Sequence, residues 1–227
     1  MDHSLVDIAK NMSIPVQLVM IFMLGMSIYF AYRVIDRMMT YSKAGNETVQ
    51  FVLGLRDQLK NHRYEEIQKA AQTYRYSPVA KVVGAGTAAY RSGKEALTHK
   101  SEHDVGEFDL VDSVNRAIDR VKEREVSNLR KGLAGIGTVA TATPFVGLFG
   151  TVIGIINAFA LLKGNATIEV IGPAIAEALY ATAGGLLIAI FAAMGFNYCT
   201  TRVEELTVDM NDVSSEFVDH ILREGRS

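Results

Sequence analysis

The chain has a single cysteine, few prolines and almost no net charge, and each shortage excludes a class of protein. The lone Cys199 makes no internal disulfide, so the sequence does not indicate a redox compartment. Four prolines in 227 residues, with no Gly/Ser-rich run, argue against disorder and against a long flexible linker. The formal net charge of -2 gives no reason to expect nucleic-acid binding.

The chain does contain three long apolar stretches that are nearly free of charged residues. Hydrophobic residues make up 49% of it although 21% is charged, so the charges must be segregated. The first apolar stretch, from Ile14 to Tyr32, has about 19 residues and would measure roughly 28 Å as a helix, enough to cross a bilayer. The acidic leader and the lack of a cleavage site argue against a signal peptide. Two later stretches of about 31 residues each would measure roughly 46 Å, so we expect these helices to project beyond the bilayer.

These stretches divide the chain into an ordered series of segments. Basic residues flank the central region and follow the third stretch, whereas the N-terminus and the hairpin loop carry one lysine each. The positive-inside rule therefore predicts a cytoplasmic middle region and C-terminus. The expected segments are a periplasmic N-terminus at 1–13, transmembrane helices at 14–35, 132–162 and 170–201, a cytoplasmic helical region at 36–131, a periplasmic loop at 163–169 and a cytoplasmic C-terminal helix at 202–227.

The polar segments have helical periodicity, and no strand pattern or internal repeat is evident. Apolar residues recur at helical spacing within 49–59, 111–121 and 203–221, and Ser77-Pro78 is typical of a helix start. We expect a loop at 95–109. The fold class predicted is an all-α membrane protein with three transmembrane helices, two of them long and extending into a cytoplasmic helical bundle.

Small residues line one face of each long stretch. Their spacing of three and four places each set on one side of its helix, where small side chains allow membrane helices to approach closely. Tight packing is sufficient to explain most of them. The residues expected at this contact are Gly147, Gly150 and Gly154 on the second stretch and Ala178, Ala181 and Gly185 on the third.

Thr151, Thr182 and Glu177 are the polar residues of interest in these stretches. Both threonines lie roughly 16–18 Å from the outer ends of antiparallel helices, so we expect them at one level. A bond to a carbonyl one turn back is the simpler explanation for either alone. A carboxylate within a span costs about 2.5–3.5 kcal/mol and should face a partner or water. Glu177 could pair with a neighbouring subunit or a threonine, or could belong to an ion path; position alone does not decide.

The two long stretches resemble a known family. The segments 143–155 and 172–190 are similar, in order and spacing, to the paired signature of the MotA/TolQ/ExbB proton-channel family, closest to its ExbB/TolQ branch, and 75–83 is similar to that family's small-residue cytoplasmic segment. Ile153 stands where many ExbB proteins have tryptophan, which argues less for the iron-uptake branch.

The resemblance implies a pore-forming subunit of an inner-membrane motor complex driven by protons. It implies a homopentamer surrounding a dimer of an ExbD/TolR-like single-span partner with an essential membrane aspartate, in contact with lipid and acting on a TonB-like or motility effector. No cofactor is expected. Thr151, Thr182 and Glu177 match the family's pore residues. TonB-type transport, Tol-Pal-type envelope maintenance and gliding motility would all fit, as would protons or sodium.

The main alternative is a passive membrane scaffold whose small faces only assemble a complex. An enzyme is not expected, because the segment 84–94 has the wrong spacing for a nucleotide loop. No metal site is expected either. The five histidines are scattered, and His99 and His103, four residues apart, suit a solvated surface.

Overall fold

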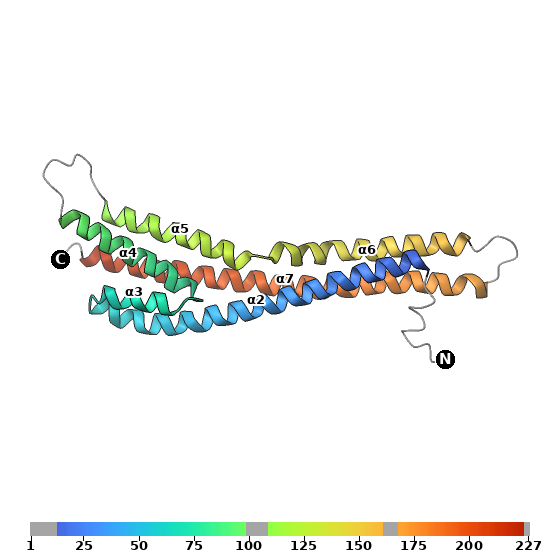
Figure 1. Ribbon diagram of the computed structural model, residues 1–227, viewed down its shortest axis with the longest axis horizontal. Helices are drawn as coiled ribbons and strands as arrows, with labels where there is room; N and C mark the ends of the chain where they lie inside the picture. Colours follow the sequence, from blue (N-terminus) through green and yellow to red (C-terminus); the bar gives the residue numbers. More distant parts are fainter. Residues whose placement is uncertain (1–12, 99–108, 161–167, 225–227) are drawn as a thin grey trace. The chain divides into compact units, whose positions relative to one another are not determined.

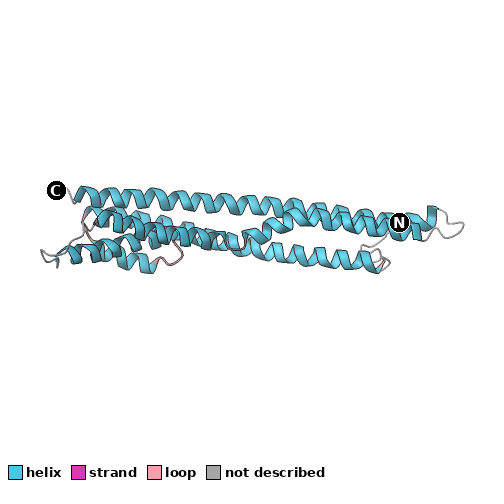
Figure 2. Cartoon of the chain, turned by 90° about the horizontal axis from the view of Figure 1, so that it is seen from above, coloured by secondary structure: helices cyan, strands magenta, loops and turns pink. Residues whose placement is uncertain are grey.

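The computed structural model describes residues 13–98, 109–160 and 168–224, and these residues form helices and connecting loops with no strand among them (Figure 2). Three of the helices are long and apolar enough to cross a membrane. The prediction of an all-α membrane fold with three such helices is therefore confirmed. The helices are α2 (Ile14–Lys60), α3 (Tyr64–Thr73), α4 (Pro78–Thr98), α5 (Leu110–Arg130), α6 (Leu133–Ala160) and α7 (Ile168–Glu224), labelled in Figure 1.

The chain separates into two compact units. Unit 1 draws on Met1–Asp36 and Gly132–Cys199, and unit 2 on Arg37–Lys131 and Thr200–Ser227. The helices α2 and α7 each contribute to both units. Residues 1–12 and 161–167, with most of the expected N-terminal segment and hairpin loop, lie outside the described residues.

Unit 1 is a packed set of three helices. Gly137 approaches Phe196 and Gly154 approaches Ala178, so α6 and α7 run antiparallel, as a hairpin requires. The helix α2 packs along α6 at two places. Tyr29 contacts Gly135 near the beginning of α6, and Val19 contacts Gly150 further along the same helix. A small apolar core closes the unit, made of Val16, Val19, Met23 and Ala181.

Unit 2 is built around α4, which lies against α3 and α5 (Figure 1). Gly84 of α4 meets Ala71 of α3, and Gly86 meets Ile118 of α5 and Phe217 of α7. A hydrogen bond from the Tyr41 hydroxyl to a carbonyl of α5, 2.9 Å long, joins α2 to this core. The side chains of α4 at the centre are fully buried, namely Val79, Ala80, Val82 and Val83.

The helix boundaries have local causes. Ser77 caps α4, since its Oγ accepts a hydrogen bond from the amide of Ala80 at 3.0 Å, and Pro78 occupies the first helical position as expected. Asp109 caps α5 by accepting two backbone amides. Gly132 separates α5 from α6 because its φ of +90° lies in the left-handed region that glycine adopts without strain.

The segment 49–59 is helical as its spacing predicts, and it forms the end of α2, since no proline interrupts the chain between Pro15 and Pro78. One sequence expectation differs from the structure. The expected loop at 95–109 is wrong at its beginning, because α4 continues to Thr98. Glu95, Ala96 and Leu97 are good helix formers with no breaking residue before them. Residues 99–108 lie outside the described ranges.

Candidate functional site

Small residues make the closest contact between α6 and α7. A Cβ atom placed at Gly147 would lie 3.1 Å from the Cα of Thr182 and 3.3 Å from that of Gly185. A Cβ atom at Gly154 would lie 2.6 Å from the Cβ of Ala178, which is closer than real side chains approach. The two backbones are therefore in direct contact, as packing in a membrane favours. The remaining small residues of this contact are Gly150 and Ala181.

Thr151 and Thr182 face each other across this contact. Their hydroxyl oxygens lie 3.1 Å apart, within hydrogen-bond distance. The Thr151 hydroxyl also donates to the carbonyl of Leu148 at 2.7 Å, and the Thr182 hydroxyl donates to the carbonyl of Gly147 at 2.9 Å. Thr151 thus makes the local bond to its own helix, and it also joins a pair that spans two helices.

The two threonine hydroxyls have fewer protons to donate than they have hydrogen-bond contacts. Each hydroxyl carries one proton and two acceptor lone pairs. Two protons serve three short contacts, namely the two carbonyls and the partner hydroxyl, so one contact always lacks a proton. The pair can accept a hydrogen bond or hold a cation with its spare lone pairs. It can also turn one proton towards an anion by giving up a bond to a carbonyl. Thr151 is 8% exposed and Thr182 is half-buried, so Thr182 is the more accessible of the two.

Glu177 lies in a second polar network of unit 1. One of its carboxylate oxygens accepts a hydrogen bond from the backbone amide of Ser13 at 3.3 Å, and the Ser13 hydroxyl accepts one from Asn157 at 3.1 Å. Ser13 directly precedes α2, where unpaired amides and the helix dipole favour a negative charge. Within the described residues the carboxylate therefore faces a helix end rather than a threonine.

The outer surface of unit 1 is apolar. Large hydrophobic side chains of all three helices are exposed, as lipid contact or burial between subunits requires. Together with the three helices that can span a bilayer, this surface makes the chain a membrane protein. The exposed residues include Leu18, Phe22, Phe145, Phe149, Leu179 and Phe191.

Comparison with known proteins identifies the family. Residues 92–212 match the family described as the MotA/TolQ/ExbB proton channel family, over more than half of the chain. The chain belongs to this family. The match includes both α6 and the membrane part of α7, and therefore the threonine pair and Glu177.

Among curated relatives, the chain is similar to proteins of both branches that the sequence resembles. It is 38% identical over 117 residues to the Tol-Pal system protein TolQ of Haemophilus influenzae, covering 51% of each chain. It is 37% identical over 131 residues to TolQ of Pseudomonas aeruginosa, covering 56% of this chain and 57% of the relative. It is 34% identical over 139 residues to the biopolymer transport protein ExbB of Pseudomonas putida, covering 55% and 42%. The matched part is thus about half the length of these relatives.

The structure also brings together residues that periodicity did not connect. The bond from the Ser13 amide to Glu177 was not anticipated, and neither was the bond from Asn157 to the Ser13 hydroxyl, because they join positions 164 and 144 apart. His62 and His220, which are scattered in the sequence, come together in unit 2, where their ring centroids lie 5.5 Å apart. Helical periodicity reports one segment at a time and gives no signal for such pairs. His3, His99 and His103 lie outside the described residues.

Proposed function

We propose that this chain is the pore-forming subunit of a motor complex in the bacterial inner membrane, driven by an ion-motive force. Membership of a proton channel family supports the class of activity. The observation that carries the proposal is the pair of hydroxyls of Thr151 and Thr182, 3.1 Å apart in an otherwise apolar contact between two membrane helices.

The proposed mechanism uses the proton shortage of this pair. An ionised carboxylate on a single-span partner accepts a hydrogen bond from one threonine hydroxyl, which then no longer donates to its backbone carbonyl. Protonating that carboxylate removes its charge, and the threonine bond returns to the carbonyl. The preferred position of the partner therefore changes with its protonation state. A charge that crosses the membrane supplies about 2.3 kcal/mol per 100 mV to drive that change.

The proposed assembly is a homopentamer around two copies of an ExbD/TolR-like partner with one membrane aspartate. The N-terminus would be periplasmic and the C-terminus cytoplasmic, as the basic flanks of the spans favour. TolQ-type and ExbB-type relatives both match, so the work performed would be Tol-Pal-type envelope maintenance, TonB-type transport or gliding motility. Small residues at the α6–α7 contact support close packing of these two helices within each subunit.

The second candidate function is a passive scaffold. The observation that favours it is that every small-residue contact described above is explained by packing alone. The position of Glu177 at the start of α2 also suits a structural carboxylate. A scaffold, however, gives no role to two hydroxyls that cannot satisfy all their contacts.

Ion flux distinguishes the two functions. The chain is purified with its single-span partner, reconstituted into liposomes that hold a pH-sensitive dye, and subjected to a potassium-diffusion potential. The channel function predicts voltage-driven proton uptake that is absent when the partner aspartate is replaced by asparagine. A sodium-specific dye in parallel vesicles identifies the ion. A correctly assembled complex that transports neither ion would leave the scaffold as the function.

A further inference from the structure

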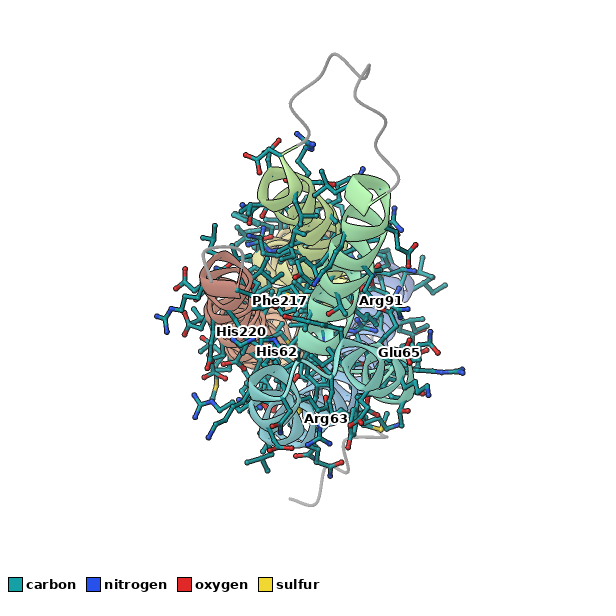
Figure 3. The ribbon with its side chains drawn as sticks, turned by 90° about the vertical axis from the view of Figure 1, so that its left-hand side faces the viewer. His62, Arg63, Glu65, Arg91, Phe217 and His220 are labelled. Carbon is teal, nitrogen blue, oxygen red and sulfur yellow. The ribbon has the colours of Figure 1, made fainter. Side chains whose placement is uncertain are left out.

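Two histidines and a glutamate converge in unit 2. His62 lies in the turn between α2 and α3, and His220 lies near the end of α7. Figure 3 shows the two histidines as neighbours, and their ring centroids are 5.5 Å apart. Glu224 lies four residues after His220 on the same helix. One ligand atom from each of the three residues lies within 4.8 Å of the other two.

We propose that His62, His220 and Glu224 bind a divalent transition-metal ion of the zinc type. Two imidazoles and one carboxylate form a donor set that zinc accepts, with the fourth position left for water. Such a mixed nitrogen and oxygen set does not suit calcium or magnesium, which take oxygen ligands. The ion would fasten the end of α7 to the turn between α2 and α3, joining positions 162 apart in the chain.

The spacing of the three side chains fits this assignment. His220 and Glu224 are four residues apart on a helix, so both project from one face, as metal-binding pairs on helices do. The Nδ1 atom of His62 lies 3.3 Å from the Oε2 atom of Glu224. Two atoms bound at about 2.1 Å to a tetrahedral zinc ion lie about 3.4 Å from each other. These two side chains are therefore already at the separation of two ligands.

The surrounding residues hold the ligands in place. The hydroxyl of Tyr64 donates a short hydrogen bond to Oε2 of Glu224, and Lys94 donates to Oε1 at 3.4 Å. Carboxylates that bind metals are commonly oriented by such outer hydrogen bonds. His62 has a φ of 53°, a left-handed conformation that is uncommon for a residue with a side chain. The turn thus directs His62 towards α7.

His220 adds an independent observation. Its Nε2 atom is buried and has no hydrogen-bond partner among the described residues. A buried polar atom without a partner costs free energy, so an imidazole placed there calls for a further ligand. His220 also lines an open cavity of about 650 Å³, and His62 lines another of about 470 Å³. An ion can therefore reach the cluster from solvent.

The test is zinc binding to the full chain in its membrane complex. The complex is stripped of metal with a chelator, dialysed against micromolar Zn²⁺ and analysed for metal content by mass spectrometry. We expect one zinc ion per chain, and at least a tenfold loss of affinity in each of His62→Gln, His220→Gln and Glu224→Gln. The matched control is Glu216→Gln, which removes the same charge from an exposed position of α7. A second control, His99→Gln with His103→Gln, removes two histidines that are not among the three proposed ligands.

Cobalt absorption distinguishes coordination from adsorption to the surface. The wild-type complex with Co²⁺ should develop the intense visible absorption of a tetrahedral nitrogen and oxygen site, and both controls should retain it. Circular dichroism verifies that each variant is folded. The proposal is overturned if wild type binds no stoichiometric zinc, which would leave the contact between His62 and Glu224 as an ordinary hydrogen bond. It is also overturned if the three ligand variants bind as well as wild type.

Discussion

The hydroxyl oxygens of Thr151 and Thr182 lie 3.1 Å apart, on two antiparallel helices whose backbones touch at Gly147 and Gly185. The close backbone approach is what permits the hydroxyls to meet. Larger residues at the glycine positions would separate α6 from α7 and break the pair. Helix packing and the proposed ion path therefore depend on the same contact. Substitutions of the glycines test the packing, and substitutions of the threonines test the ion path.

Replacing Gly154 by alanine tests the packing. The added Cβ would lie 2.6 Å from the Cβ of Ala178, so the helices must move apart. We expect the variant to lose about 1–3 kcal/mol of stability, the usual cost of overpacking. Gly25→Ala is the matched control, because nothing lies within 4 Å of its new Cβ, and its better helix propensity should make it neutral or slightly stabilising. Thermal unfolding in detergent measures both, and equal midpoints would contradict the account.

Lys81→Met tests a partly buried ion pair in unit 2. The Nζ atom of Lys81 lies 2.7 Å from Oε2 of Glu125, which is 7% exposed. Removing the lysine leaves a buried carboxylate that, among the described residues, keeps the hydrogen bond from Asn128, so we expect a loss of about 1–3 kcal/mol.

Arg56→Met is the control for this ion pair. Arg56 pairs with Glu216 on the surface, and its removal should cost less than about 1 kcal/mol. Chemical denaturation monitored by circular dichroism compares the two variants. A surface variant as destabilised as Lys81→Met would show that burial of Glu125 is unimportant.

Asp209→Asn should stabilise the protein in a pH-dependent way. Burial raises the pKa of Asp209, and the carboxylates of Asp212 and Glu205 raise it further, while Arg202 opposes them. The folded state therefore binds this proton more tightly than the unfolded state. The stability from this group is fully present below the usual aspartate pKa of about 3.9, and it is lost as pH rises through the raised pKa.

The asparagine variant avoids this loss. Because the Asp209 side chain is exposed and water screens its interactions, the gain at pH 7 should be small, at most about 0.5 kcal/mol, and it should vanish below about pH 4. Unfolding midpoints measured from pH 3.5 to pH 8 follow the difference from wild type. A gain of the same size at every pH would rule out titration of Asp209 as its cause. Asp119→Asn, on an exposed residue paired with Lys122, should show no such gain.

Glu177→Gln tests the contact between the carboxylate and the start of α2. Glutamine can still accept the bond from the Ser13 amide but lacks the charge that the helix dipole favours, so we expect a loss of about 0.5–1 kcal/mol. The bond comes from the backbone, so the loss should persist in a Ser13→Ala background. A double-mutant cycle of thermal unfolding checks this. If Ser13→Ala removes the effect of Glu177→Gln, the carboxylate depends on the serine side chain instead.

The helices could be predicted because their sequence patterns lie within short segments. Contacts between residues far apart in the sequence leave no such pattern. The charge-free stretches and the Ser77-Pro78 cap are contained in short windows of sequence, and the structure has helices where they indicate. By contrast, His62 meets Glu224 across 162 positions, and it does so through a turn whose left-handed residue is a histidine rather than a glycine. Nothing in helical periodicity marks such a turn.

The threonine pair lies between these cases. The matched depth of Thr151 and Thr182 could be worked out from helix rise and loop length. The third bond of the network, from Thr182 to the carbonyl of Gly147, could not, because it depends on how closely the helix backbones approach. The proton shortage that carries the proposed mechanism therefore became visible only in three dimensions.

Proton flux through the double variant Thr151→Val with Thr182→Val tests the central claim most directly. Valine keeps the shape of threonine without its hydroxyl, so packing of α6 against α7 should be preserved. The control is Thr143→Val, whose side chain is fully buried and whose hydroxyl donates to the carbonyl of Val139 on its own helix at 2.6 Å. The account predicts that the double variant assembles with its partner and loses at least tenfold in voltage-driven flux, while Thr143→Val transports normally. An assembled double variant with wild-type flux would contradict it.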